Sequence, residues 1–294
     1  LALMDLKNAP SPELPSDAAD LAAMRREIER LNAETGGGFL LAVRARVFSP
    51  TENEFTGYER KRGAIEALIR RIKDGADGFL LTCGDLSFLD TAKYVLCLDA
   101  DTELPFAALQ KLLCVACHPA NRAVWDEKTG RVVSGYGCFA PRTEVSRACS
   151  AATRFARVFT WGGISAYSAR VSSRYMDLFG TGVFCGKGLV DIDVYWAACC
   201  GAFPAGRVLS HDILEGGLMR TAFVSSVALT EGFPAAPGSY FKRQSRWIRG
   251  DVQNLAFLFR PLARGRSLTA LTKYQLMDNV SRALLPPACL VLLL

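Results

Sequence analysis

The stretch YVLCLDADTELP (94–105) joins an apolar strand pattern to a cluster of acids. Five residues suited to a buried strand, Tyr94 to Leu98, run directly into Asp99 and Asp101. In an open α/β sheet, ligands bind beyond the carboxyl ends of the strands. Two carboxylates this close in a strand-end loop suit one divalent cation and leave coordination positions open for phosphate oxygens. A solvated acidic turn is the alternative interpretation.

The segments around this stretch alternate between strand and helix patterns. Strands are predicted at 1–6, 39–48, 79–83, 94–98 and 131–142, and helices between Ser16 and Gly36 and at 57–75 and 105–117. This alternation predicts an α/β fold in which helices flank a central sheet. Ser16 is placed to cap the first of these helices, which has one apolar face made by Leu21, Met24, Ile28 and Leu31. Asp5 ends the first strand, as Asp99 follows a later one, so both carboxylates are expected at strand ends.

The composition is that of a globular protein with a mild positive charge. Of 294 residues half are hydrophobic, and 35 Lys and Arg against 29 Asp and Glu give a net charge of +6. This charge fits a nucleotide ligand or an anionic membrane surface, although many proteins with neither have it too. We expect no nucleic-acid partner.

The ten cysteines do not form a recognisable metal or disulfide pattern. Cys114 and Cys117 make up a CxxC inside an apolar helix pattern, and no second pair or well-spaced histidines complete a zinc site. We therefore expect free, partly buried thiols in a reducing compartment.

Two segments suggest contact with a membrane. The apolar end LLPPACLVLLL (284–294) is predicted to be the start of a membrane helix, with a buried terminal helix as the alternative. The basic segment 147–163, with the aromatics Phe155, Phe159 and Trp161, fits a helix packed on the sheet or one lying on a membrane surface. The chain begins at Leu1 without an export segment, so we expect a fragment.

The string SHDILEG (210–216) offers a candidate base. Ser210 is placed to cap a helix beginning near His211, which would make Asp212 a first-turn acid favoured by the helix dipole. The functional alternative is that Asp212 is a general base that deprotonates a sugar hydroxyl. His211 is the other candidate for this role.

The string RQSRWIRGD (243–251) offers a cationic clamp. Arg243, Arg246 and Arg249 recur every three residues, with Trp247 among them. They form either a solvated basic face with the tryptophan in the core, or a clamp on a leaving diphosphate beside a stacking wall for a sugar.

The glycine-rich string GTGVFCGKGLVDID (180–193) lacks the GxxxxGK[ST] pattern and is therefore not a Walker-type phosphate loop. Gly182, Gly186 and Gly188 indicate backbone held close to a ligand or to another strand.

Taken in order, these strings resemble a known family. GYERKRG, DAD, GKG, HD and RxxRW before an apolar segment are similar to the membrane-bound inverting glycosyltransferases related to cellulose and hyaluronan synthases. The strings LDADTELP, SHDILEG and RQSRWIRGD most resemble the glucosyltransferase domain of cyclic β-1,2-glucan synthases. The resemblance covers nearly the whole chain.

The resemblance implies a role for each matching residue. Asp99 would contact nucleotide and metal, Asp101 would bind Mg²⁺ or Mn²⁺ and Asp212 would be the catalytic base. The other implied substrate-binding residues are Asp5 (uracil or ribose), Lys61 (near the nucleotide), Gly186, Lys187, His211, Arg243, Arg246 and Trp247.

The resemblance further implies a GT-A fold at residues 1–260, lacking its first strand. This fold is Rossmann-like and binds a nucleotide sugar, with a mostly parallel or mixed central sheet flanked by helices. A membrane-proximal segment with the start of a transmembrane helix is implied at 261–294. The implied reaction transfers glucose from UDP-glucose to a growing glucan with inversion. The implied partners are this acceptor, lipids of a bacterial inner membrane with the catalytic domain facing the cytoplasm, and the rest of a full-length synthase. A synthase of another β-glycan and a catalytically disabled membrane-associated fragment are the alternatives.

Overall fold

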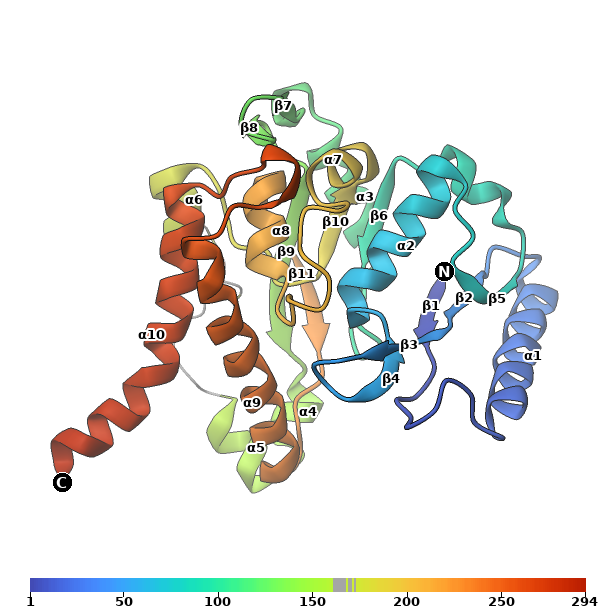
Figure 1. Ribbon diagram of the computed structural model, residues 1–294, viewed down its shortest axis with the longest axis horizontal. Helices are drawn as coiled ribbons and strands as arrows, with labels where there is room; N and C mark the ends of the chain where they lie inside the picture. Colours follow the sequence, from blue (N-terminus) through green and yellow to red (C-terminus); the bar gives the residue numbers. More distant parts are fainter. Residues whose placement is uncertain (161–167, 169–170, 172) are drawn as a thin grey trace. The chain divides into compact units, whose positions relative to one another are not determined.

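The computed structural model describes residues 1–160, 168, 171 and 173–294, which fall into two compact units. Unit 1 comprises residues 1–93 and 204–209, and unit 2 comprises residues 94–203 and 210–294. Both units combine helices with mixed parallel and antiparallel sheets, as predicted (Figure 1). The division at residue 260 into a glycosyltransferase domain and a membrane-proximal segment stays a prediction.

Unit 1 is a sheet with the strand order β1-β2-β5, accompanied by the hairpin β3-β4. Its strands are β1 (Ala2–Asp5), β2 (Leu41–Arg44), β3 (Arg46–Ser49), β4 (Glu54–Gly57) and β5 (Phe79–Cys83), and its helices are α1 (Asp17–Thr35), α2 (Arg60–Asp74) and the short 3₁₀ helix η1 (Leu86–Thr91). The predicted apolar face of α1 is confirmed, because Ile28 is buried against Leu41 and Val43 of β2.

One predicted strand of unit 1 is wrong in its extent. The pattern at 39–48 forms two strands in different sheets, separated at Ala45. The flanking residues Arg44 and Arg46 are buried, and each pairs with a carboxylate, Asp5 and Asp17 respectively. Buried guanidinium groups need such partners, and these ion pairs accompany the change of sheet.

Unit 2 contains a larger sheet with the strand order β11-β9-β10-β6. Its strands are β6 (Tyr94–Cys97), β7 (Val124–Asp126), β8 (Arg131–Ser134), β9 (Cys138–Val145), β10 (Gly188–Asp191) and β11 (Thr221–Glu231). Its α-helices are α3 (Ala108–Ala116), α4 (Arg147–Ala151), α5 (Arg154–Phe159), α6 (Arg174–Phe179), α7 (Ile192–Ala198), α8 (Asp212–Met219), α9 (Pro237–Asn254) and α10 (Ala270–Leu293), and its 3₁₀ helices are η2 (Pro119–Asn121), η3 (Leu255–Leu258) and η4 (Ala263–Gly265).

The strand directions of unit 2 bring several chain ends to one edge of the sheet. β6 and β9 each run antiparallel to β10, and β11 runs parallel to β9. One side of the sheet, where strands end or begin, therefore holds the carboxyl ends of β6 and β11 together with the amino end of β10. Asp99, Lys187 and Glu231 belong to these three ends.

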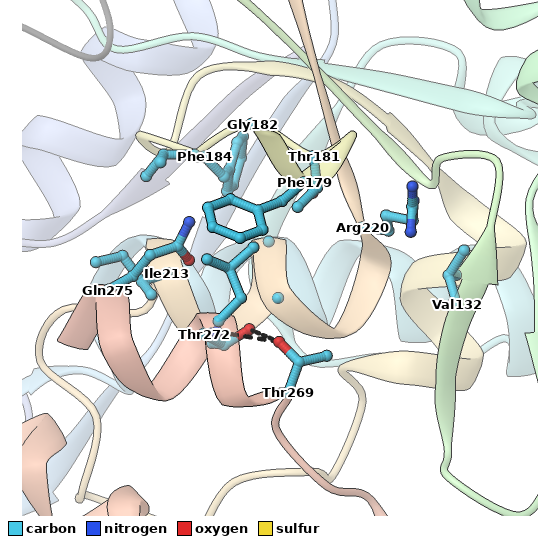
Figure 2. A pocket seen from close by; sticks show the side chains of 14 residues that line it. Val132, Phe179, Thr181, Gly182, Phe184, Ile213, Arg220, Thr269, Thr272 and Gln275 are labelled. Atoms are coloured by element: carbon cyan, nitrogen blue, oxygen red, sulfur yellow. Dashed lines mark hydrogen bonds between the residues drawn. The ribbon is translucent and has the colours of Figure 1, made fainter. Parts of the chain in front are cut away.

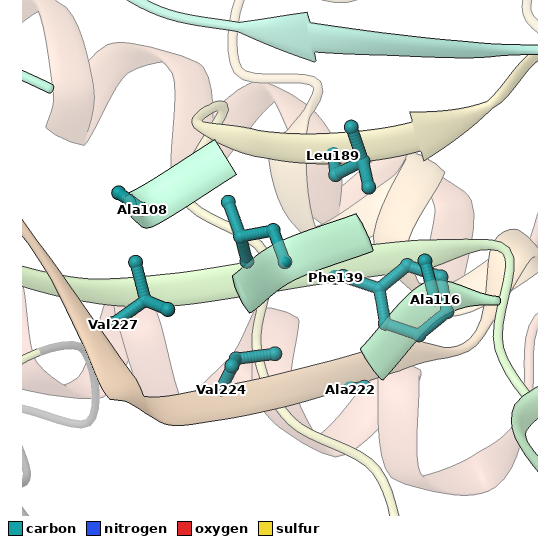
Figure 3. Packing of buried hydrophobic residues seen from close by; sticks show 8 residues of the cluster. Ala108, Ala116, Phe139, Leu189, Ala222, Val224 and Val227 are labelled. Carbon is teal, nitrogen blue, oxygen red and sulfur yellow. The ribbon is translucent and has the colours of Figure 1, made fainter. Parts of the chain in front are cut away.

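The sheet of unit 2 is covered on both faces. Leu112 of α3 packs with Phe139 of β9, Leu189 of β10 and Val224 of β11 in one apolar cluster (Figure 3). Side chains alternate between the faces of a strand, so Cys138 points away from this cluster. Thr221 of β11, the partner of Cys138, points the same way and donates its hydroxyl to Gly216 O, which places α8 on the face opposite α3.

Three further predictions differ from the structure in detail. The pattern at 131–142 forms β8 and β9, because Gly135 turns the chain with a φ of +64°. The pattern at 147–163 forms two short helices, α4 and α5. A new helix begins after Thr153, because the Thr153 hydroxyl accepts a hydrogen bond from Ala156 N and caps α5. Trp161 lies outside the described residues. Ser16 makes no side-chain capping bond to α1.

Helix α10 is long and apolar enough to cross a membrane, by length and composition only. Its first half packs on the rest of unit 2 through Thr272, Gln275 and Leu276, which are buried. Its second half, which contains Pro286 and Pro287, carries strongly exposed leucines, ending with Leu293 at 84% exposure.

Candidate functional site

The acidic string that follows β6 forms a tight turn at the edge of the sheet. Thr102 N donates to Asp99 O at 3.0 Å, and Glu103 is bridged to Thr230 of β11 through backbone bonds. The turn is thereby fixed to the neighbouring strand end. The side chain of Asp99 is 40% exposed, and Asp101 is exposed.

Lys187 connects Asp99 to a second carboxylate. Its Nζ lies 2.9 Å from Asp99 Oδ2 and 3.0 Å from Glu231 Oε1, and the residue is 9% exposed. Burial lowers the pKa of Lys187, but Asp99 and Glu231 together raise it more, so that the pKa lies above its ordinary value. Lys187 is therefore a permanent cation that holds two strand ends together.

The acidic turn has the chemistry of a cation site that is completed by a ligand. Among the described residues, no group of three or more His, Cys, Asp or Glu side chains could hold a metal ion. Mg²⁺, however, commonly keeps several waters and binds one or two carboxylates together with substrate phosphates. Asp99 and Asp101 supply such oxygen donors at a solvent-exposed turn, and they fit a cation that binds together with a diphosphate.

The candidate base Asp212 opens α8. The helix begins at Asp212 with His211 at its N-cap position, and no side-chain capping bond is formed, so the predicted cap by Ser210 is wrong. Asp212 is nevertheless a first-turn acid, as expected. Its side chain is 32% exposed, and its Oδ1 lies 3.2 Å from His211 Nε2.

The glycine-rich string packs against Asp212 and against the sheet. A Cβ atom on Gly186 would lie 2.8 Å from Asp212 Oδ1, and one on Gly188 would lie 2.5 Å from Phe139 O. The predicted close approach to another strand is thus confirmed at Gly188, and also at Gly182, where a Cβ would lie 2.9 Å from Phe223 Cβ of β11. At Gly186 the neighbour is the candidate base itself.

Arg243 of α9 sits among aromatic rings. Its guanidinium carbon lies 4.9 Å from the ring centre of Trp247, 5.4 Å from that of Phe233 and 6.0 Å from that of Tyr240. Burial lowers the pKa of Arg243, although Tyr240, Glu231 and Asp101 act in the opposite direction. Its Nε is buried and has no hydrogen-bond partner among the described residues.

Trp247 and Arg246 lie on the accessible part of α9. Trp247 is 45% exposed, which excludes the alternative that this side chain is anchored in the core. Arg246 is exposed, and its charge acts on Arg243. An exposed indole face beside two cations suits a sugar next to a phosphate group.

The same helix is fastened to the segment before Asp212. A Cβ on Gly250 would lie 2.7 Å from Ser210 Cβ, and Asn254 Nδ2 donates to Ser210 O at 2.5 Å. Arg243 and Gly250 are two turns apart, a separation of about 10 Å along a helix. Helix α9 therefore extends from the surroundings of Asp101 and Glu231 to the start of α8.

Two predicted binding residues lie in unit 1. Asp5 forms a two-point ion pair with Arg44, with both N–O distances at 2.7 Å. Arg44 also donates to the carbonyl oxygens of Tyr58 and Arg60. Lys61 lies in the first turn of α2. The nucleotide-binding roles of Asp5 and Lys61 stay predictions.

A cavity of about 260 Å³ lies on α8 and is lined in part by the strings 180–193 and 210–216 (Figure 2). Its walls come from the segment 179–184, from α8 and from the start of α10, and include Phe184, Ile213 and Gln275. The start of α10, the helix that is long enough to cross a membrane, forms part of this wall, and Asp212 is not among the lining residues.

Sequence reasoning missed two carboxylates. Glu231 ends the long strand β11 and meets Lys187, and Glu215 is completely buried on α8. A signal existed for Glu231, since it ends a strand as an acid in the way that Asp99 follows one. Glu215 follows Asp212 by one helical turn, and only the structure shows that it faces inward.

The comparison with known proteins gives one clear relative. The chain is 36% identical to the cyclic beta-(1,2)-glucan synthase NdvB of Rhizobium meliloti (strain 1021), over 98% of its own length. It spans 10% of the length of that synthase. No protein-family model matches the chain. The resemblance to the cyclic β-1,2-glucan synthases is therefore confirmed, and the chain corresponds to a segment of such a synthase.

Proposed function

Because the chain is similar along nearly its whole length to a segment of a cyclic β-1,2-glucan synthase, we propose that it is the glucosyltransferase domain of such an enzyme. The domain takes the GT-A fold, uses UDP-glucose as donor and transfers glucose to a growing β-1,2-glucan with inversion. The coarser role in glucan synthesis is supported by the relative, and the donor and mechanism are our proposal.

The observation that carries the proposal is the arrangement of three motifs within unit 2. Asp99 is tied to Lys187 at the sheet edge, Asp212 opens α8, and α9 reaches both regions. Anion binding, proton removal and sugar stacking are the functions that a nucleotide-sugar transferase has to combine.

A single displacement uses these groups without a covalent intermediate. An acceptor hydroxyl oxygen attacks the anomeric carbon of glucose, and the bond from that carbon to the diphosphate oxygen breaks. Asp212 takes the hydroxyl proton, and UDP leaves with the electron pair. Arg243 and Arg246 stabilise the negative charge that grows on UDP, and Trp247 stacks on the acceptor sugar.

We assign the cation site to Asp99 and Asp101. Bound there, Mg²⁺ or Mn²⁺ would neutralise charge on the diphosphate. Lys187 holds Asp99 in place from the side of β10. Gly186 and His211 lie against Asp212 and position it beside the substrate that they help to bind.

The location proposed is a bacterial inner membrane with the catalytic domain in the cytoplasm. Helix α10 supports the membrane association in this proposal, because its exposed leucines match a lipid surface. Inner-membrane lipids, the glucan acceptor and the rest of the synthase are then the partners.

The proposal is tested by supplying membranes that contain the protein with radiolabelled UDP-glucose and, in parallel, with labelled UDP-N-acetylglucosamine. We expect incorporation from UDP-glucose alone, into a product whose linkage analysis shows 1,2-bonds. Incorporation from the other donor, or a product with 1,4-bonds, would instead identify a synthase of another β-glycan. No incorporation by folded protein would identify a disabled domain.

A further inference from the structure

A fully buried carboxylate lies directly beneath the candidate base. Glu215 is 0% exposed, and Tyr195 of α7 donates its hydroxyl to Glu215 Oε1 at 2.6 Å. The other oxygen, Oε2, lies 2.6 Å from His211 Nδ1. An ionised carboxylate in the interior is strongly unfavourable unless it is paired and hydrogen-bonded, and Glu215 meets both requirements.

His211 connects this carboxylate to Asp212. Its second ring nitrogen, Nε2, lies 3.2 Å from Asp212 Oδ1. The imidazole is thus held between two carboxylates that differ in access to solvent, since the side chain of Asp212 is 32% exposed and that of Glu215 is 0% exposed. Asp212 is able to meet an acceptor, and Glu215 is not.

The number of protons shared by the side chains of Glu215, His211 and Asp212 follows from the contacts between them. Two nitrogen–oxygen contacts join Glu215, His211 and Asp212, at 2.6 and 3.2 Å, and each needs one proton between its atoms to be a hydrogen bond. A doubly protonated imidazole supplies both and leaves the two carboxylates ionised, with a net charge of −1. A buried acid that orients a histidine toward the reacting group is a known catalytic arrangement.

We propose that Glu215 is a positioning residue that acts through His211: it keeps the imidazole protonated, so that Nε2–H donates to Asp212 and holds that base ionised and oriented. This inference rests on the proposed function, in which Asp212 deprotonates the acceptor. It also predicts that glucosyl transfer depends on pH, because the arrangement is lost at pH values at which His211 gives up its proton.

The surrounding titratable groups are compatible with this charge state. Asp251 of α9 acts on Asp212, and burial chiefly raises the pKa of Asp251. Burial raises the pKa of the Cys185 thiol, which acts on Asp212, to about 12, and it raises the pKa of Cys138, which faces Glu215. Both thiols are neutral near pH 7, and an ionised Asp251 would further favour the protonated imidazole.

The test is the pH dependence of glucosyl transfer by the full-length protein in membranes, comparing wild type with Glu215→Gln. Removing the buried negative charge makes the imidazole lose its proton at lower pH. We expect the alkaline limb of the kcat/KM profile to move down by about one pH unit, with the KM for UDP-glucose unchanged. A uniform loss of rate with an unmoved limb would show a merely structural role and overturn the inference.

Two further variants make the result specific. Tyr195→Phe removes a hydrogen bond to Glu215 but keeps the negative charge of Glu215, so the alkaline limb of its kcat/KM profile should move far less. A shift as large as that of Glu215→Gln would show that the charge of Glu215 is not the cause. In a His211→Gln background, Glu215→Gln should not change the profile further. If Glu215→Gln does not fold, His211→Gln still tests the inference, because an alkaline limb that persists without the imidazole would overturn it.

The same assay separates this inference from the proposed function. Asp212→Asn should abolish transfer if Asp212 is the base. If it does so while Glu215→Gln leaves the limb in place, only the inference on Glu215 fails. If Asp212→Asn transfers glucose at the wild-type rate, the proposed mechanism itself fails.

Discussion

Gly186 lies so close to Asp212 that a single methyl group on it would fall 2.8 Å from the Asp212 Oδ1 atom. The backbone of Gly186 also has a φ of +76°, a conformation that other residues rarely adopt. The glycine-rich string therefore leaves space for the proposed base and fixes the loop that passes it.

Gly186→Ala should reduce glucosyl transfer more than its effect on stability explains. The positive φ costs about 1–2 kcal/mol for alanine, and the added methyl group displaces the carboxylate. Gly206→Ala is the matched control, since Gly206 has a φ of +66° and no atom within 4 Å of its added Cβ. Thermal unfolding should show similar losses for both variants, and activity should fall by at least tenfold for Gly186→Ala alone. Equal activities would contradict the role of this contact.

Asp212→Asn should lower kcat by at least about 100-fold, because a general base commonly contributes that much or more. Asp177→Asn is a suitable control, since Asp177 is also a first-turn acid, in α6, and loses the same helix-dipole contribution. We expect its kcat to stay near that of wild type. A comparable loss in both variants would mean that the dipole effect, not proton transfer, explains the loss at Asp212.

A chelator should abolish transfer, and added Mg²⁺ or Mn²⁺ should restore it. In Asp101→Asn the metal concentration needed for half-maximal activity should rise by at least about tenfold, as expected when a metal site is impaired. Glu103→Gln removes a nearby exposed acid of the same string and should leave the requirement unchanged. Activity that survives the chelator would refute the cation site.

The ion pair in unit 1 between Asp17 and Arg46 predicts an acid-dependent loss of stability. The Arg46 hydrogen bond, aided by Leu14 N, lowers the pKa of Asp17 from 3.8 to about 2. A lowered pKa stabilises the fold above the unfolded value, and this contribution disappears as the pH falls from about 4 to about 2.

Asp17→Asn should therefore unfold at lower urea concentration than wild type at pH 7, and the two midpoints should converge toward pH 2. Asp20→Asn, which changes an exposed acid in the same helical turn, should behave like wild type. A gap between the midpoints of Asp17→Asn and wild type that stays constant over this range would exclude the ion pair as its source.

The membrane assignment of α10 predicts a difference between two exposed cysteines. Cys289 lies in the apolar half of α10, and Cys114 lies on α3. In open membrane sheets, a charged maleimide should label Cys114 and not Cys289, while denaturation in detergent should make both reactive. Rapid labelling of Cys289 in intact sheets would place α10 outside the bilayer.

Much of the fold and the approximate position of the site could be predicted from the sequence. The apolar strand before Asp99 and the periodicity of α1 and α2 fix elements through local preferences. The position of Asp99 directly after a strand was predictable from the same local pattern. The break at Ala45 was not predictable, because it involves ion pairs of Arg44 and Arg46 with residues distant in the sequence.

The rest of the candidate site depends on contacts across unit 2. Nothing near Glu231 in the sequence indicates that it shares Lys187 with Asp99, since this follows from the order of the strands in the sheet. Glu215 has the position of an ordinary helix carboxylate, and its role depends on the packing of α7 against α8. Local patterns do not carry such information.

The number of residues between the two ends of α9 determines how the contacts made at those ends are placed relative to each other. One end carries the aromatic setting of Arg243, and the other carries the contact of Gly250 with Ser210. One inserted residue between them would turn the second end by about 100° relative to the first. Substitutions on the exposed face of α9 should therefore be tolerated. An insertion or deletion between Arg243 and Gly250 should not be, because it would change both the distance and the rotation between the two contacts.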